Sequence, residues 1–353
     1  MLQDESTFDA SDELEDEKEE LYEHTVIKVD RGQQPIRIDK FLTNRLEAVS
    51  RSRIQNVADA GLLMVNGAPV KVNYKIKPLD EITILVTKAS HEYKLEPEDI
   101  PLNIVYEDDS IVIINKQVGL VVHPGSGNYT GTLVNALLHH FGNNLPTGKN
   151  SSDIRPGLVH RIDKDTTGLM IIAKDEAVMT HLAKQFFDHT IKRRYVALVW
   201  GDVVEDEGTI NVNLARNLRF RKKMDVFPDG DHGKHAITHY KVLERLGYVT
   251  LVECILETGR THQIRVHMMS IGHPLFNDST YGGDEIRKGT IYSKYKQFVD
   301  NCFKLMPRQA LHAKVLGFYH PVLKKEMLFE SPLPEDFESV LEKWRHYNKY
   351  KKD

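Results

Sequence analysis

The spacing of apolar residues between positions 37 and 86 predicts a small module of two helices followed by short strands. The first helix is indicated by four apolar residues at helical spacing, Ile38, Phe41, Leu42 and Leu46. Ser50 or Ser52 is suited to begin the second helix, and Gly61 is suited to end it. A strand at 62–65, a turn at Asn66-Gly67 and further strands up to residue 86 complete the predicted module.

A larger region is predicted from about residue 104 onward. Apolar runs indicate strands at 111–115, 168–175, 194–201 and 248–259, and helical spacing is found at 131–141, around 182–187, at 261–270 and at 334–347. Pro334 falls at the first turn of the last helix, a position that proline favours. Because the strands and helices do not follow a strict βαβ alternation, the pattern favours an α+β fold over a doubly wound sheet.

Composition and charge divide the rest of the chain. Residues 88–103, "KASHEYKLEPEDIPLN", are polar and contain two prolines, so we expect an interdomain linker there. Residues 1–20 hold ten acids against one lysine, a net charge of −9, which leaves +5 on the remainder of a chain whose total is −4. We therefore predict a disordered acidic tail over 1–24, a small domain over 25–87 and a large domain over 104–353.

The acidic tail is open to two interpretations. A self-repelling acidic segment with few large apolar residues most simply keeps the protein in solution, and we favour that interpretation. In the alternative, the tail competes with a polyanion for the basic remainder of the chain.

Bulk features exclude several classes of protein. No apolar run approaches the length that spans a bilayer, and the N-terminal "MLQDESTFDA" does not have the features of a signal peptide. The chain has two cysteines, Cys254 and Cys302, and no CxxC motif, which favours a reducing cytoplasm. We expect a cytoplasmic protein that makes no membrane contact.

Motifs that hold nucleotides or metals are not matched. "GSGNYTG" and "GNNLPTGKN" have the wrong spacing for a dinucleotide fold and for a P-loop. There is no HExxH motif among the seventeen histidines, and His262, His267 and His273 do not follow a known ligand pattern. We therefore expect neither a metal nor a cofactor.

Basic residues are concentrated in the small module. Residues 37–80 contain eight Lys or Arg and four acids, a net charge of +4. Arg51 and Arg53 stand at the start of the second helix, where positive charge and free N–H groups together suit phosphate. Lys71 and Lys75 follow in the strand region. These four residues are candidate nucleic-acid contacts, although a solvated basic face would have the same composition.

A candidate reactive carboxylate lies in "VHRIDKDTTG", residues 159–168. Asp163 follows Arg161 and precedes a threonine pair and a buried strand. A carboxylate kept ionised in a partly dry cleft can act as a nucleophile or a base. From this segment alone a structural interpretation is favoured, in which Asp163 pairs with Arg161 or Lys164.

Several ordered motifs resemble known RNA-modifying proteins. The order Arg37-x-Asp39, Ser50-Arg51-Ser52 and Gly61-x-x-x-Val65-Asn66-Gly67 resembles the S4 RNA-binding domain. "NKQVGLVVHPGSGNYTGTLVNALL", "HRIDKDTTGLMIIAKD", "RRYVALVWG", "ETGRTHQIRVHM" and "RQALHAKVLGFYHP" resemble the RluA family of pseudouridine synthases, and in particular its RluD-like branch. The resemblance covers about residues 25–340. Leu79 departs from the S4 pattern, and Gln117, Ile162 and Thr167 depart from the RluA-family pattern.

The resemblance implies a fold, an activity and a set of site residues. The large domain would be a pseudouridine synthase domain built on a mixed or antiparallel sheet. Asp163 would be the catalytic aspartate, Tyr195 would stack on the target uracil, and Arg265 would pair with the aspartate. Ile264 would line the same pocket, and Arg161 would help to displace the target base and occupy its place. Asp163 would attack C6 of the base, attack C1′ of the sugar, or abstract a sugar proton.

The resemblance also implies the partner. A monomeric enzyme is expected to act on large-subunit ribosomal RNA, flipping a uridine out of its stack. The alternatives are a synthase acting on transfer RNA or on several RNAs, a non-catalytic S4-type ribosome-assembly protein, and a metal-dependent hydrolase that uses the histidines. Gly131, Gly168 and Gly259 are interpreted as turn residues.

Overall fold

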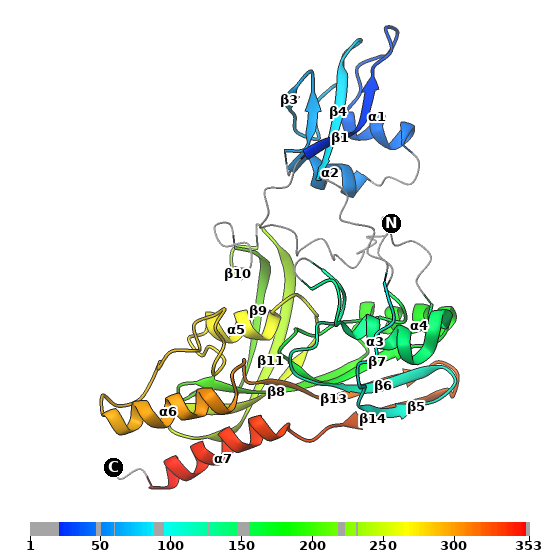
Figure 1. The fold of residues 1–353 in the computed structure, drawn as a ribbon. Coiled ribbons are helices and arrows are strands. Elements are labelled where there is room, and N and C mark those ends of the chain that lie inside the picture. Colours follow the sequence, from blue (N-terminus) through cyan, green and yellow to red (C-terminus); the bar gives the residue numbers. More distant parts are fainter. Residues whose placement is uncertain are drawn as a thin grey trace. The chain divides into compact units, whose positions relative to one another are not determined.

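A computed structural model describes most of the chain as two compact units (Figure 1). The described ranges are 21–46, 51–59, 61–87, 95–125, 128–146, 155–217, 223–230 and 232–350. The described residues up to 87 form the small unit, and those from Leu95 onward form the large unit.

The small unit combines a four-stranded sheet with two helices. Its strand order is β1-β4-β2-β3, with β1 at Leu21–Lys28, β2 at Leu63–Val65, β3 at Ala68–Pro69 and β4 at Glu81–Thr87. The helices α1 (Ile38–Arg45) and α2 (Arg51–Asp59) follow the predicted apolar spacing, and Ile38, Phe41 and Leu42 are buried in the core. Asn66 and Gly67 adopt φ of 52° and 78°, so the turn between β2 and β3 has the predicted left-handed residues.

Leu79 occupies a backbone conformation that normally favours glycine. Its φ is +70°, and its side chain is exposed. The turn nevertheless closes, since the N–H of Leu79 donates to the carbonyl of Val29 at 3.0 Å and that of Asp80 donates to the carbonyl of Lys77 at 3.1 Å. The departure from the S4 pattern at this position therefore leaves the turn intact but places a leucine in a strained region.

The large unit is built on a ten-stranded mixed sheet. The strand order is β10-β9-β11-β12-β8-β13-β7-β6-β5, with β14 paired to β13. The pair β7–β13 is parallel, and the other described pairs of this sheet are antiparallel. The strands are β5 (Ile104–Glu107), β6 (Ile111–Lys116), β7 (Thr167–Ala173), β8 (Lys192–Trp200), β9 (Glu207–Arg216), β10 (Met224–Phe227), β11 (Lys234–Arg245), β12 (Val249–Leu256), β13 (Leu311–His320) and β14 (Lys325–Glu330). The prediction of an α+β fold with a mixed sheet is confirmed.

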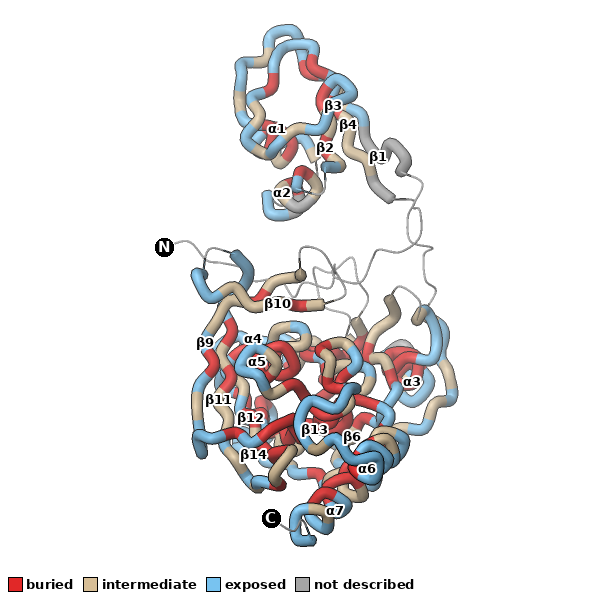
Figure 2. The backbone as a smooth tube through the Cα atoms, turned by 90° about the vertical axis from the view of Figure 1, so that its left-hand side faces the viewer, coloured by how far each residue is buried: buried red, intermediate tan, exposed pale blue. Residues whose placement is uncertain are grey.

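Helices pack on this sheet, and their buried side chains form hydrophobic cores together with those of the strands. The described helices of the large unit are α3 (Leu133–Phe141), α4 (Glu176–Phe187), α5 (Gln263–Ser270), α6 (Ser293–Leu305) and α7 (Glu335–Tyr350), with a short 3-10 turn at Gly142–Asn144. The helices α6 and α7 lie side by side, and Trp344 of α7 meets Trp200 of β8 with ring centroids 6.1 Å apart (Figure 1). Buried positions are concentrated along strands such as β6 and β13 (Figure 2).

The unit boundaries differ from the expected domain limits in two places. Residues 21–24, expected in the acidic tail, belong to β1, because they pair with β4. Residues 95–103, expected in the linker, belong to the large unit, because Leu95, Ile100 and Leu102 pack against its core and Glu98 accepts hydrogen bonds from the N–H of Gly131. The tail at 1–20 and the remaining linker at 88–94 lie outside the described residues.

Candidate active site

Asp163 lies in a tight turn that leads into β7. The carbonyl of Asp163 accepts a hydrogen bond from the N–H of Thr166 at 3.1 Å, and β7 begins at Thr167. The side chain of Asp163 is 21% exposed, so the carboxylate is shielded but accessible. The turn therefore presents this carboxylate just before the start of the buried strand β7.

Arg265 connects Asp163 to a second carboxylate, that of Asp278. Nη1 of Arg265 donates to Asp163 Oδ2 at 2.9 Å. Nε and Nη2 of the same guanidinium donate to the two carboxylate oxygens of Asp278, at 2.7 and 2.9 Å. The Asp278 side chain is fully buried and also accepts from the N–H groups of Thr280 and Tyr281. Because Asp278 fixes two of its nitrogens, Arg265 has little freedom to move away from Asp163.

The electrostatic surroundings keep Asp163 ionised. Burial acts to raise the pKa of the Asp163 carboxyl, but the charges of His262 and Arg265 and the hydrogen bond from Arg265 outweigh burial and hold this pKa at about 2. Burial lowers the pKa of His262 itself, so its imidazole is neutral near pH 7 and carries its charge only at acidic pH, where Asp163 would titrate. Near pH 7 the positive charge beside Asp163 comes from Arg265. Arg161 is exposed two residues away, and its charge also lowers the pKa of Asp163.

His262 and Tyr281 complete the wall beside the ion pair. Nε2 of His262 lies 3.9 Å from Asp163 Oδ2, and its Nδ1 lies 3.0 Å from the Tyr281 hydroxyl. That hydroxyl accepts a hydrogen bond from the N–H of Met224, and the Tyr281 ring lies 5.2 Å from the Arg265 guanidinium carbon. The loop after β12 and the loop after α5 therefore both support the site.

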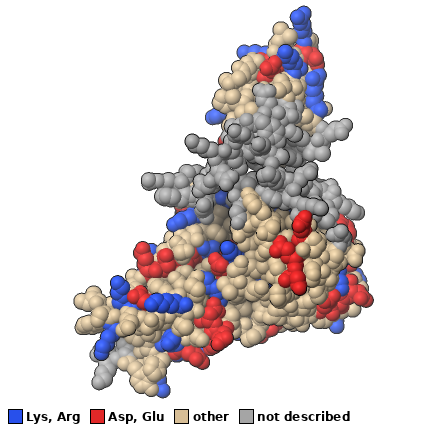
Figure 3. Space-filling view, viewed as in Figure 1, with Lys and Arg blue, Asp and Glu red and all other residues tan. Residues whose placement is uncertain are grey.

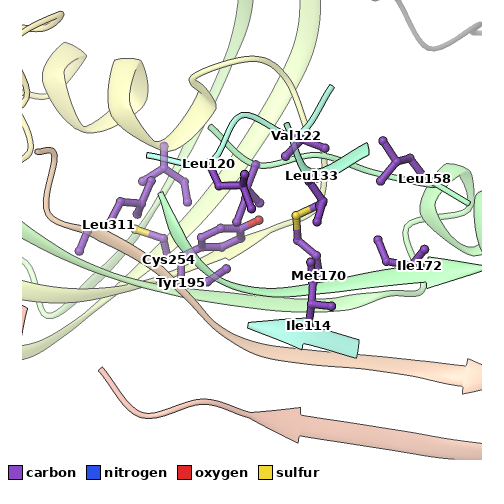
Figure 4. Packing of buried hydrophobic residues seen from close by; sticks show 14 of the residues in the cluster. Ile114, Leu120, Val122, Leu133, Leu158, Met170, Ile172, Tyr195, Cys254 and Leu311 are labelled. Carbon is purple, nitrogen blue, oxygen red and sulfur yellow. The ribbon is translucent and has the colours of Figure 1, made fainter. Parts of the chain in front are cut away.

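Tyr195 and Ile264 belong to the core cluster next to Asp163. Tyr195 lies in β8 and pairs with Cys254 of the neighbouring strand β12 (Figure 4). Ile264 belongs to the same core cluster as Tyr195. Burial raises the pKa of the Tyr195 phenol, and the charge of Asp163 acts in the same direction. The hydroxyl has no hydrogen-bond partner within the described ranges, and it retains some solvent access. The ring is therefore a largely buried aromatic surface close to the carboxylate.

Two buried basic side chains, Lys116 and Arg308, hold the backbone immediately after Asp163. Lys116, at the end of β6, donates to the carbonyls of Gln117, Leu120 and Lys164 at 2.8–2.9 Å. Burial lowers the pKa of Lys116 to about 7, against the opposing charges of two nearby carboxylates. Lys116 therefore holds the carbonyl of Lys164, and Arg308 holds the carbonyl of the next residue, Asp165.

Arg308 precedes β13 and links the turn to α7. Its Nη1 donates to the carbonyl of Asp165 at 3.2 Å, while Nε and Nη2 donate to the carboxylate of Asp336 at 2.7 and 2.9 Å. Gln309 also lies 3.3 Å from the hydroxyl of Thr166. The turn that carries Asp163 is therefore fixed on both sides by buried side chains.

Glycine occupies the three predicted turn positions, 131, 168 and 259, for different structural reasons. Gly131 has φ of +69°, as a turn residue would. Gly168 also has positive φ, but a Cβ there would lie 2.2 Å from the carbonyl oxygen of Ala313, so glycine is required by the close approach of β7 to β13. Gly259 does not have positive φ; a Cβ there would lie 2.7 Å from Nη1 of Arg193. The turn interpretation is wrong for Gly259 and incomplete for Gly168.

Three of the four predicted basic residues of the small unit lie on its surface. Arg51, Lys71 and Lys75 are exposed, and Arg53 lies in α2 with its side chain outside the described part. Lys and Arg side chains are visible on the surface of the small unit (Figure 3). Arg37, which was not among the predicted contacts, lines a surface hollow together with Lys71, and its backbone bridges to that of Lys75. Arg37 also donates to both carboxylate oxygens of Asp39.

Other site residues also escaped the sequence analysis. Lys116, Asp278 and Arg308 are buried and hold the candidate site together. In the sequence, Lys116 follows the apolar run at 111–115 and Arg308 follows Leu305-Met306-Pro307, whereas Asp278 stands between Asn277 and Ser279. Within the described ranges, no cluster of three or more His, Cys, Asp or Glu side chains is placed to hold a metal ion. None of the helices described here is long and apolar enough to cross a membrane.

Comparison with known proteins assigns the family. The RNA pseudouridylate synthase family model matches residues 110–270, and the S4 domain model matches residues 36–82. A Chlorobaculum parvum protein named as an uncharacterized RNA pseudouridine synthase is 46% identical over 320 residues, which cover 90% of this chain and 97% of that protein. A Zymomonas mobilis protein named ribosomal large subunit pseudouridine synthase D is 42% identical over 304 residues, covering 86% and 92%.

A solved structure supports the same assignment. The human protein titled RNA pseudouridylate synthase domain containing 4 aligns with a TM-score of 0.51 and 26% identity, covering 69% of this chain and 93% of the human chain. The family match at 110–270 includes Asp163, Tyr195 and Arg265. The chain belongs to the RluA family of RNA pseudouridine synthases, in its RluD-like branch with an N-terminal S4 domain, and is an RNA-modifying isomerase.

Proposed function

We propose that this enzyme converts specific uridines of large-subunit ribosomal RNA to pseudouridine, with Asp163 as the catalytic aspartate. The observation that carries the proposal is the hydrogen bond of 2.9 Å between Arg265 and the accessible, ionised carboxylate of Asp163. A salt-bridged loop with a purely structural role would not need an accessible carboxylate beside a neutral histidine and a buried tyrosine. Each of the three roles open to Asp163 requires the ionised form.

The target uridine leaves its stack before it reacts. Extruding a base costs a few kcal/mol, and stacking on an aromatic ring recovers about 1–3 kcal/mol. Tyr195 supplies that ring, Ile264 lines the same pocket, and Arg161 occupies the place that the base has left. The reaction breaks the bond between C1′ and N1, turns the uracil and joins C1′ to C5. The proton lost from C5 is balanced by a proton gained at N1, so neither a redox step nor a metal or cofactor is needed.

The ribosomal target is supported by the name of the Zymomonas mobilis relative, which covers most of this chain. The S4 unit adds exposed Arg51, Lys71 and Lys75, which with Arg53 suit the phosphates of a long structured RNA. We further propose that the enzyme acts as a monomer in the cytoplasm, where ribosomal RNA is available as a substrate.

The test is a map of pseudouridines in the RNA of cells with and without this gene. We expect one or more pseudouridines of large-subunit ribosomal RNA to disappear when the gene is deleted and to return when it is restored. Restoration with Asp163→Asn is expected to fail, while Arg194→Gln, which changes an exposed strand residue, should restore the modification. Loss of sites from transfer RNA alone would overturn the ribosomal assignment, and no loss at all would overturn the proposal.

A further inference from the structure

Arg193 is a buried arginine that the reaction described above does not use. It lies in β8 two residues before Tyr195, so the two side chains point to the same face of the sheet. Only 8% of the residue is exposed. Its charge is close enough to Tyr195 and His160 to influence both groups. Arg193 therefore lies next to the proposed uracil pocket.

The guanidinium of Arg193 lacks a carboxylate partner among the described residues. Nη2 donates to the carbonyl of Glu257 at 3.1 Å, and the guanidinium carbon lies 5.5 Å from the centroid of the Phe186 ring. Nε is buried without a hydrogen-bond partner in the part of the chain that the structure describes. By contrast, Arg265 and Arg308, which are buried to a similar extent, each bind a carboxylate through two nitrogens.

The remaining nitrogen, Nη1, faces an opening at Gly259. It makes no hydrogen bond within the described ranges, and it is not fully buried. Gly259 is exposed, and a Cβ at this position would lie 2.7 Å from Nη1. Since the φ of Gly259 does not require glycine, the missing side chain instead leaves room at Nη1. The same loop continues to His262, which lies 3.9 Å from Asp163.

An uncompensated buried cation is costly unless an anion joins it. The anionic groups of an RNA substrate are its phosphodiesters, and a guanidinium binds them through short, charge-assisted hydrogen bonds. We infer that Arg193 binds a phosphodiester of the RNA substrate through Nη1, in the gap that Gly259 leaves beside the uracil pocket. The inference rests on the proposed function, since it places this phosphate next to the uridine that reacts at Asp163.

The test measures how RNA affinity depends on salt. Each phosphate contact that is lost makes the slope of log Kd against log salt shallower by about 0.7–0.9. Full-length protein is titrated with unmodified large-subunit ribosomal RNA transcribed in vitro, across a KCl series. We expect Arg193→Gln to weaken binding about tenfold and to reduce the slope by the value for one contact. A loss of packing alone would weaken binding without changing the slope.

Two further variants make the result decisive. Arg194→Gln removes the same charge from the neighbouring, exposed position, which lies 3.9 Å from Glu253, and should keep the wild-type slope. Gly259→Ala keeps Arg193 but places a methyl group at Nη1, and should reduce the slope as Arg193→Gln does. Gly259→Ala also tests the inference if Arg193→Gln does not fold. The added methyl group would meet only the flexible end of the Arg193 side chain, so this variant should still fold.

Two results would overturn the inference: an equal change of slope in Arg193→Gln and Arg194→Gln, or a wild-type slope in Gly259→Ala. The assignment of Asp163 is tested separately, because Asp163→Asn should abolish turnover and leave the slope unchanged. Should that variant retain turnover, the proposed function fails while the salt slopes still decide whether Arg193 binds phosphate.

Discussion

The charged side chains around Asp163 and the basic side chains proposed to bind RNA in the small unit are arranged in opposite ways. Around Asp163 they are buried or half-buried and held in fixed pairs, with Arg265 placed between two carboxylates. In the small unit, Arg51, Lys71 and Lys75 are exposed on the surface. A guanidinium that two carboxylates already hold loses little side-chain entropy when it orients a reacting group. An exposed lysine instead contributes to RNA affinity mainly by releasing counterions from a phosphate.

This difference in charge arrangement should separate two measurable properties, the rate of the reaction and the salt dependence of RNA binding. Substitutions around Asp163 should change the rate of the reaction and leave the salt dependence of RNA binding unaltered. Substitutions of the exposed basic residues should do the reverse. The side chain of Arg193 combines burial with an open nitrogen, and it is the residue of the large unit for which we expect a change in salt dependence.

The largest effect is expected from Asp278→Asn. The substitution keeps the shape of the side chain but removes the charge that fixes two nitrogens of Arg265. We expect the free energy of unfolding of the large unit to fall by about 3 kcal/mol, and turnover at saturating RNA to fall at least about a hundredfold. Denaturant unfolding and single-turnover kinetics measure the two effects. The control is Glu253→Gln, which changes a half-buried carboxylate that lies 3.9 Å from the exposed Arg194 and should cost under about 1 kcal/mol. Wild-type turnover in Asp278→Asn would show that a fixed Arg265 is not needed.

A smaller effect on the rate is expected at Tyr195. Tyr195→Phe keeps the ring that stacks on the base, whereas Tyr195→Leu removes it. Since stacking is worth about 1–3 kcal/mol, kcat/KM should fall about ten- to a hundredfold in the leucine variant and stay closer to wild type in the phenylalanine variant. Thermal unfolding of both proteins controls for lost packing in the core. If the leucine variant has wild-type kcat/KM, Tyr195 is a core residue only.

The small unit should respond in the opposite way. Replacing both Lys71 and Lys75 with glutamine removes two exposed charges and should make the salt slope of RNA binding shallower by about 1.4, at about 0.7 for each single-strand contact. The single-turnover rate at saturating RNA should not change. Lys28→Gln is the matched control, since its amine lies 3.5 Å from the carboxylate of Glu81. If this variant had a changed single-turnover rate and an unchanged salt slope, the proposed division of roles between the small unit and the site around Asp163 would be contradicted.

The smallest effect concerns the backbone of the small unit. Leu79 has φ of +70° and is 62% exposed, so glycine would relieve strain while little buried apolar surface is lost. We expect Leu79→Gly to stabilise the small unit by about 0.5–1 kcal/mol, because the relief exceeds the entropy that glycine adds to the unfolded chain. Amide hydrogen exchange in β4 of the full-length protein measures it. Lys324→Gly, at another positive φ in the large unit, should leave that exchange unchanged. Faster exchange in Leu79→Gly would contradict the expectation.

The elements with regular apolar spacing could be predicted from the sequence. The strands β6, β7, β8 and β12 are nearly continuous apolar runs, and α1 and α3 show clear helical spacing. The helix α6 was missed because only Tyr295, Val299 and Cys302 are buried along its thirteen residues. The strands β9 and β11 were missed because exposed and half-buried positions dominate them.

The candidate site could be predicted only in part. Asp163, Tyr195 and Arg265 were identified through their motifs. Asp278 and Lys116 gain their importance from tertiary contacts, since Lys116 meets the Lys164 carbonyl from 48 residues away. A charged residue directly after an apolar run was the available signal for Lys116, but exposed charges occupy such positions as well. Asp278 stands between Asn277 and Ser279 and has no such signal in the sequence. The reason for glycine at 259 depends on where the Arg193 guanidinium lies, and a single sequence does not contain that information.

The most direct test of the central claim is pseudouridine formation by Asp163→Asn on large-subunit ribosomal RNA under single-turnover conditions. The variant keeps the volume of the side chain but removes its charge, so we predict no detectable product, with RNA affinity and salt slope as in the wild type. Because the pKa of Asp163 is about 2, below its ordinary 3.8, the carboxylate stays ionised as the pH falls to about 3. The wild-type rate should therefore show no acid limb from Asp163 between pH 5 and 7. Product formation by Asp163→Asn at more than about a tenth of the wild-type rate, a loss of under about 1.4 kcal/mol, would contradict the account.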